Sequence, residues 1–271
     1  MICDKKEIFI LKEVIFITCI LVFSLLLSFR AFSEEGSAIK AESYLYEGDM
    51  QMFNGKSEEA QNLYEFVLKE DPHSYGALWR LSRFYISRGM AAKRIVDKKK
   101  EWRKAKDYGR HAVQINPNGA EGHLYLAIAI GKLALFSSPR EKVKSVWEVK
   151  REAEKAIELD PTQQKAYLAL GAWHRNVATA SLLEKKFAKI FFGELPKASL
   201  EESLQFLLKS ISLGGREVRN YYELALTYEA MGNYEAAKKE YMNALYAKPI
   251  YPEDAELKKR VKKTLCESQY N

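Results

Sequence analysis

The 271-residue sequence predicts an all-α fold built from repeated helix pairs, and two observations support this prediction. The chain contains only 14 glycines and 7 prolines, so few residues break helices and few supply the turns of an all-β fold. Short stretches that end a helix also recur along the chain. A composition that is 47% hydrophobic and 29% charged is typical of a globular chain with a sizeable core.

The repeat is seen in its helix ends. Proline stops a helix because it lacks the backbone N–H and clashes with the preceding turn. Four ends are marked by proline and a fifth by glycines: VLKEDP to Pro72, AVQINP to Pro117, AIELDP to Pro161, SISLGG to Gly215 and ALYAKP to Pro249. The spacing and residue types resemble the tetratricopeptide pattern, which repeats about every 34 residues.

The first and last units match this pattern closely. Small residues let two helices approach, and aromatic residues fill the space between units. The matching positions are Gly48, Ala60, Tyr64 and Pro72 in the first unit, and Tyr221, Leu224, Ala225, Tyr228, Ala237, Tyr241 and Ala244 in the last. The sequence therefore predicts a tetratricopeptide-type helical-repeat solenoid of about five helix pairs.

The middle units are longer than the pattern. Pro117 lies 45 residues after Pro72, and Pro161 lies 44 residues after Pro117. The second unit holds the basic stretch AAKRIVDKKKEWRKAK at 91–106, which we expect to form a helical extension. Its outward residues then form a 98–103 basic cluster (Lys98, Lys99, Lys100 and Arg103) with Trp102 turned inward. The functional alternative is a contact with anionic lipid headgroups.

The fourth unit, from about 164 to Gly215, contains the insertion LLEKKFAKIFF at 182–192. On a helical wheel four apolar residues share one face and three lysines the opposite face. These are Leu183, Phe187, Ile190 and Phe191, and Lys185, Lys186 and Lys189. We expect this stretch to extend the first helix of its unit and to pack its apolar face on the solenoid. Membrane-surface contact and a partner-binding lip are the alternatives.

The N-terminal segment differs from the rest. Lys5, Lys6 and Lys12 precede an apolar run from Val14 to Phe29, and Ala31-Phe32-Ser33 resembles a cleavage site. Residues 1–33 are therefore predicted to be a bacterial-type signal peptide or a retained membrane anchor, and residues 34–271 the repeat domain. The expected location is the cell envelope, either periplasmic or anchored by this segment.

Several stretches resemble one protein family. LWRLSRFY at 78–85, REAEKAIELDP at 151–161, LGAWHRNVA at 170–178 and FAKIFFGELPKASLEESLQFLLKS at 187–210 are similar to sequences of the regulator of microtubule dynamics family. The resemblance covers roughly residues 40–265 and indicates a bacterial member. It implies a tetratricopeptide-like fold, an association with the cytoskeleton and, in animals, with organelle membranes.

The sequence shows no motif for a chemical reaction. It lacks a phosphate-binding loop, a metal-binding pair of histidines on one helix and a nucleophile elbow. His174, beside Trp173, is more typical of a core or groove histidine than of a catalytic one. We therefore expect a non-enzymatic protein with no cofactor, no metal and no nucleic-acid partner. Three cysteines form no disulfide framework.

A solenoid of helix pairs presents a concave surface lined by the first helix of each pair. The corresponding positions select eight candidate residues for a partner-binding groove: Trp79, Arg83, Leu124, Ile128, Leu168, Arg175, Tyr222 and Glu229. We expect a scaffold that binds a protein or peptide partner there. The alternative is a small-molecule or lipid-binding component of an envelope transport system, because Leu124, Ile128 and Leu168 are apolar.

Overall fold

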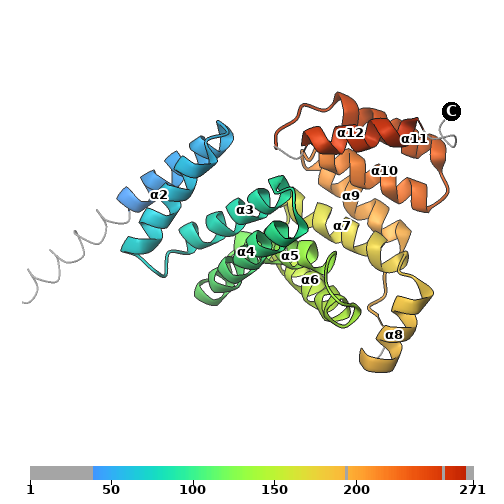
Figure 1. Ribbon diagram of the computed structural model, residues 1–271, viewed down its shortest axis with the longest axis horizontal. Helices are drawn as coiled ribbons and strands as arrows, with labels where there is room; N and C mark the ends of the chain where they lie inside the picture. Colours follow the sequence, from blue (N-terminus) through green and yellow to red (C-terminus); the bar gives the residue numbers. More distant parts are fainter. Residues whose placement is uncertain (1–38, 193–194, 252–253, 267–271) are drawn as a thin grey trace, which may run out of the picture. The chain divides into compact units, whose positions relative to one another are not determined.

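The structure is a computed structural model that describes residues 39–192, 195–251 and 254–266, where every regular element is a helix (Figure 1). The chain divides into two compact units, one up to Leu63 and one from Tyr64 onward. The predicted signal peptide or anchor lies outside the described residues, and the domain boundary at residue 34 stays a prediction. None of the described helices is both long and apolar enough to cross a bilayer.

The first unit contains a helix over 39–53 and the first half of α2 (Ser57–Glu70). Gly55 lies between these helices with φ of 79°, a left-handed conformation that only glycine adopts without strain. Helix α2 ends just before Pro72, as the proline-terminated pattern predicted.

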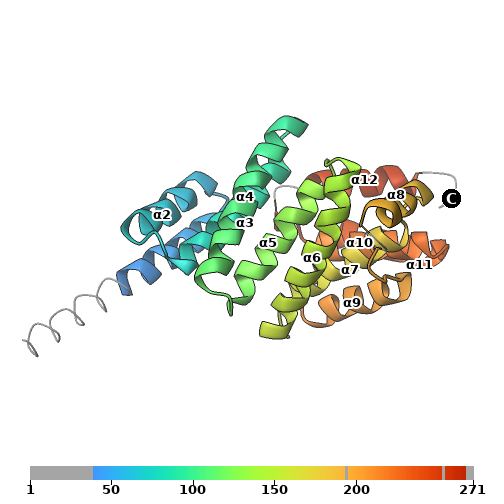
Figure 2. The same cartoon turned by 90° about the horizontal axis from the view of Figure 1, so that it is seen from below.

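The second unit contains the remaining helices in chain order: α3 (Tyr75–Ala91), α4 (Ile95–Ile115), α5 (Ala120–Ala134), α6 (Pro139–Leu159), α7 (Gln164–Ala178), α8 (Leu182–Phe192), α9 (Leu200–Ser212), α10 (Val218–Ala230), α11 (Tyr234–Tyr246) and α12 (Asp254–Leu265). The main packing pairs are α3 with α4, α5 with α6, α7 with α9 and α10 with α11. Helix α12 packs on α10 and α11 (Figures 1 and 2). The predicted solenoid of helix pairs is confirmed.

Small residues set the distance between paired helices. A Cβ atom added at Gly171 of α7 would lie 2.7 Å from Leu207 Cγ of α9. Helices α7 and α9 therefore pack with almost no gap at this point. The Ser203 hydroxyl of α9 donates to the carbonyl of Gly171 at 2.8 Å, and the Ser82 hydroxyl of α3 donates to Ala105 of α4 at 2.8 Å. These bonds satisfy buried polar groups where the helices approach.

The extra length of the middle units lengthens their second helices. Helices α4 and α6 have 21 residues each, and α6 begins with a capping box formed by Ser138 and Glu141. In α4 the indole of Trp102 is buried and its N–H donates to the carbonyl of Ile86 at 3.2 Å. Residues of the 98–103 basic cluster are exposed or half-buried. The expected helical extension is confirmed.

The expectation for residues 182–192 was wrong in two respects. They form a separate helix, α8, because α7 ends at Ala178 and Ser181 begins a new helix. The hydroxyl of Ser181 accepts from the backbone N–H of Glu184 at 3.2 Å, and the carboxylate of Glu184 accepts from the backbone N–H of Ser181 at 2.9 Å. In addition, Ile190 and Phe191 are exposed rather than packed on the solenoid.

Candidate functional site

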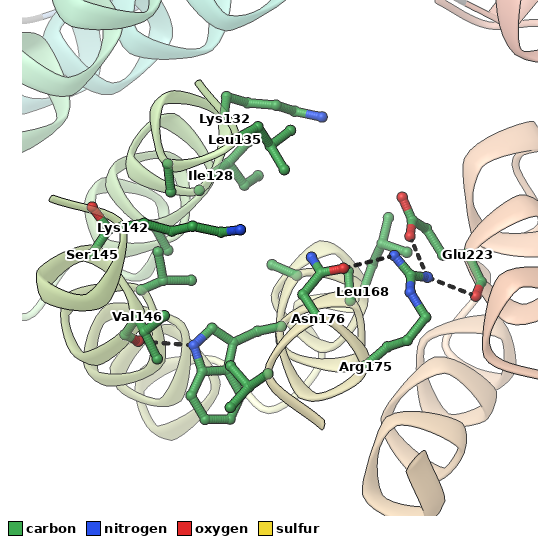
Figure 3. Close-up of a pocket in the computed structure, with 18 of the residues that line it drawn as sticks. Ile128, Lys132, Leu135, Lys142, Ser145, Val146, Leu168, Arg175, Asn176 and Glu223 are labelled. Atoms are coloured by element: carbon green, nitrogen blue, oxygen red, sulfur yellow. Dashed lines mark hydrogen bonds and ion pairs between the residues drawn. The ribbon is translucent and has the colours of Figure 1, made fainter. Parts of the chain in front are cut away.

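A pocket of about 590 Å³ lies in the second unit among α3, α5, α6, α7 and α10 (Figure 3). Its wall is mostly apolar because these helices turn aliphatic side chains toward it at helical spacing. The apolar lining residues include Ile86, Met90, Ile128, Leu135, Val146, Leu168, Trp173, Phe187 and Leu195. A pocket of this size and character accommodates a small amphiphile or the side chains of a peptide.

A network of ion pairs lines the wall of the pocket that α7 and α10 form. The guanidinium of Arg175 lies 2.7 Å from the buried carboxylate of Glu223, and Arg219 lies 3.2 Å from the other carboxylate oxygen. Arg175 also donates to the backbone carbonyl of Glu223 at 3.1 Å (Figure 3). Burial opposes the charge on Glu223, but the two arginines outweigh it and lower its pKa to about 2.

A second polar group is centred on Lys165 of α7. Its ammonium donates to the hydroxyl of Tyr251 at 2.8 Å. Burial disfavours the charge, but Tyr125, Tyr251 and Glu217 outweigh it and hold the pKa of Lys165 above its ordinary value. Lys165 is therefore a half-buried cation at neutral pH.

Basic residues outnumber acidic ones in the lining. Figure 3 shows Lys132 and Lys142 extending from α5 and α6 into the space beside Arg175, and Lys142 pairs with Glu184 of α8. The basic lining residues are Arg83, Lys132, Lys142, Lys165, Arg175 and Arg219, and the acidic ones are Glu184, Glu217 and Glu223. The pocket therefore combines an apolar wall with a positive balance, which favours a ligand that has an apolar body and an acidic group.

Four of the eight predicted groove residues line this pocket, namely Arg83, Ile128, Leu168 and Arg175. Trp79 does not line it; its ring stacks on Tyr125 with centroids 5.7 Å apart. Leu124 is 1% exposed because α5 is packed against α3, α4, α6 and α7, and it does not line the pocket.

The other two predicted residues do not line the pocket, and both contact Tyr241 of α11. The ring of Tyr222 lies 6.1 Å from that of Tyr241 and belongs to the core formed with α11 and α12. The carboxylate of Glu229 accepts from the Tyr241 hydroxyl at 2.7 Å. Both residues therefore serve the packing of α10 in this structure, and their role in binding stays a prediction.

Sequence reasoning found Arg83 and Arg175 but missed the other charged residues of the pocket. Lys165 and Glu217 lie outside the repeat positions used for selection, and Tyr251 follows the last repeat. The spacing of Arg219 and Glu223 was the available signal, since an opposite pair four residues apart shares one helix face.

The histidines belong to no candidate metal cluster in the described part of the chain. There, no group of three or more His, Cys, Asp or Glu residues could hold a metal ion. His174 is buried between Trp173 and Phe206, with ring centroids 4.8 and 5.2 Å away, and burial lowers its pKa. These contacts place it in the core.

Known proteins resemble this chain in sequence and in fold. Regulator of microtubule dynamics protein 2 of Bos taurus is 29% identical over 187 residues, which cover 69% of this chain and 46% of that protein. Regulator of microtubule dynamics protein 1 of Mus musculus is 25% identical over 201 residues, 73% of this chain and 65% of that protein. The chain thus spans about half the length of the first relative.

A solved thermophilic TPR protein of Thermus thermophilus has the same fold, with a TM-score of 0.58 and 20% identity over 84% of this chain and all of that one. The sequence pattern of the family described as "Regulator of microtubule dynamics protein 1-3" matches residues 44–270. This match extends over the helix pairs, the α8 insertion and the pocket that they enclose, and the chain therefore belongs to the regulator of microtubule dynamics family.

Proposed function

We propose that this protein is a non-enzymatic scaffold that binds a segment of a partner protein in the pocket between α5, α6, α7 and α10. The observation that carries the proposal is the apolar wall of Ile128, Leu168 and their neighbours beside the half-buried cation Lys165. A peptide segment with apolar side chains and a carboxylate would match both features. Helical-repeat proteins commonly use such inner surfaces for recognition.

The second candidate function is binding of a lipid-like small molecule with an acidic headgroup, as part of a transport system of the envelope. The volume of about 590 Å³ favours it, since small-molecule sites have volumes of about 300–1,000 Å³. The same basic residues would then hold the headgroup, and the apolar wall would cover the hydrocarbon.

A photo-crosslinking amino acid at Leu168 in the full chain distinguishes these functions. Irradiation in cells is expected to join the chain to a polypeptide, identified by mass spectrometry of the adduct. A mass increase that corresponds to a lipid would instead support the second candidate. If irradiation yields neither adduct, both functions of the pocket are refuted.

A matched pair of substitutions controls for nonspecific crosslinking. Ala172→Phe places a ring in the pocket and should abolish the adduct, because Ala172 lines it. Ala255→Phe adds the same ring at an exposed position of α12 and should leave the adduct unchanged. Thermal unfolding of both variants checks that the fold persists. Equal crosslinking in the two variants would contradict a pocket-bound partner.

We also propose that the protein resides in the cell envelope, exported or anchored by residues 1–33. The support is the order of basic residues, apolar run and small residues in that segment. Fractionation with protease protection, and N-terminal sequencing of the mature chain, test this. The names of the relatives refer to microtubule dynamics, and a cytoskeletal partner would appear as a filament protein in the crosslinked adduct.

A further inference from the structure

Helix α8 presents an unusual outer face. It packs on α6 through the side that carries the buried Ala188 and the half-buried Phe187. Elsewhere on α8 three large apolar residues are exposed: Leu182 is 79% exposed, Ile190 74% and Phe191 63%, and the ring of Phe191 lies 4.6 Å from that of Phe187. Exposed apolar residues that gather on one short helix indicate an interaction surface, whereas scattered ones do not.

Lysines lie among these apolar residues. The helical wheel grouped Ile190 with the face opposite the lysines, but Ile190 lies at the edge of that group. Leu182, Lys186 and Ile190 are spaced by four, so they follow one another along a single stripe of the helix. Lys185 and Lys189 are exposed on one side of the stripe, and Phe191 lies on the other. We call these six residues the α8 outer face.

The outer face carries a net positive charge. Glu184 is the only acidic residue in the sequence of α8, and it lies on the inner side, where Lys142 of α6 pairs with it. Lys142 and the backbone and hydroxyl of Ser181 lower the pKa of Glu184 to about 2. Glu184 therefore stays ionised and paired with Lys142. Three lysines are thus left on the outer face without an acidic residue among them.

We propose that the α8 outer face docks on a membrane surface that contains anionic lipids. The aliphatic and aromatic side chains would enter the headgroup region, while the lysine stems bury their methylenes and keep the ammonium groups among the phosphates. A short helix with this mixture binds by apolar burial and charge attraction together. The inference requires no ligand in the pocket and is independent of the proposed partner.

Two other occupants fit the face less well. The core of a protein interface is depleted in lysine, whereas here Lys186 lies between Leu182 and Ile190. A second copy of the chain, docked through the same face about a two-fold axis, would bring lysines against lysines. The arrangement therefore favours phosphate-rich headgroups over either protein surface.

The test uses the full chain with an environment-sensitive fluorophore on a single cysteine. Cys3, Cys19 and Cys266 become serine, and Ile190→Cys receives the label. The protein is mixed with vesicles of phosphatidylcholine alone or of phosphatidylcholine with phosphatidylglycerol. Because the N-terminal apolar segment can bind both kinds of vesicle, the readout is the local environment at residue 190 rather than sedimentation.

We expect a blue shift of the label with the anionic vesicles and little change with neutral ones. Lys186→Gln with Lys189→Gln should lower the affinity of this contact roughly thirtyfold, from the attraction that each basic residue contributes near an anionic surface. Lys185 stays unchanged because it also donates to the carbonyl of Ala178 at 3.3 Å. Neutralising the 98–103 basic cluster of α4 instead provides the matched charge control and should leave the signal intact.

A label at Tyr246→Cys is the positional control, since this side chain of α11 is 80% exposed but has no such basic surroundings within its helix. The proposal is overturned if the label at 190 remains in water on anionic vesicles, or if neutral and anionic vesicles shift it equally. A shift that depends on protein concentration without vesicles would also overturn it and assign the face to a second copy. Equal shifts at 190 and 246 would show that the contact is not specific to α8.

Discussion

Replacing His123 with leucine is expected to destabilise the protein because this histidine is a buried cation. Its Nδ1 lies 2.6 Å from the carboxylate of Glu152, and its Nε2 lies 2.9 Å from the carbonyl of Pro117. Both partners only accept hydrogen bonds, so the ring satisfies both by carrying a proton on each nitrogen. The side chains of His123 and Glu152 are both nearly inaccessible to solvent.

The size of the stability loss depends on the partners that Glu152 keeps after His123 is replaced. Removing one partner of a buried ion pair costs about 3–5 kcal/mol. Arg151 still donates to Glu152 at 2.7 and 3.0 Å, so the carboxylate keeps a partner and the loss lies at the lower end. The carbonyl of Pro117 loses its donor as well. We therefore expect the free energy of unfolding to fall by about 3 kcal/mol.

The pH dependence has a defined sign. The hydrogen bond that His123 donates to Glu152 raises the pKa of His123, while burial and Lys155 oppose this rise. A raised folded-state pKa contributes stability that is complete below the unfolded pKa of about 6.5 and disappears as the pH rises through the folded value. The wild-type chain should therefore lose stability as the pH rises above about 6.5, and the leucine variant should lack this loss.

Urea unfolding of both proteins from about pH 6 to about pH 9 measures the effect across the ordinary and raised pKa. A double-mutant cycle with Glu152→Gln isolates the coupling between the two side chains. The reasoning fails if His123→Leu costs less than about 1 kcal/mol at pH 6 or retains the wild-type pH dependence.

Three further outcomes are expected. Gly171→Ala should cost about 1–3 kcal/mol in thermal unfolding, because the new methyl would strike Leu207. Glu223→Gln should lower the free energy of unfolding by about 2–3 kcal/mol at neutral pH. The folded-state pKa of Glu223 is lowered to about 2, so the wild type should lose stability as the pH falls below 4.5, and the glutamine variant should lack this loss. Glutamine substitutions throughout the 98–103 basic cluster should change stability by less than about 0.5 kcal/mol in urea unfolding; a larger loss would contradict its solvated placement.

The helix pairs could be predicted from the sequence because local signals and packing agree there. Proline follows the last turn of α2, α4, α6 and α11 within a few residues, and the small residues of the pattern mark the contact faces. The inward position of Trp102 followed from the same periodicity. These features depend on residues near one another in the chain, which is where sequence patterns carry the most information.

The pocket was predicted only in part because it depends on how successive pairs are stacked. Repeat positions found Ile128 and Arg175, yet they also selected Leu124, which neighbouring helices cover. Lys165 donates a hydrogen bond to Tyr251, which lies 86 residues later in the chain. No local sequence pattern predicts a contact over that distance. Helix α8 was misread although Ser181 and Glu184 form a recognisable capping box.

The insertion of α8 between two paired helices has a consequence for how this chain could have acquired it. Helices α7 and α9 are separated by 21 residues, whereas the ordinary turn between α10 and α11 has three. Each doubling of a flexible connection adds about 0.6 kcal/mol of closure entropy, so the longer connection costs about 2 kcal/mol at most. The hydrogen bond from Ser203 to Gly171 joins α9 to α7 across this longer connection. A repeat can thus gain an additional helix in one step, keep its fold, and leave that helix open to selection for a new contact.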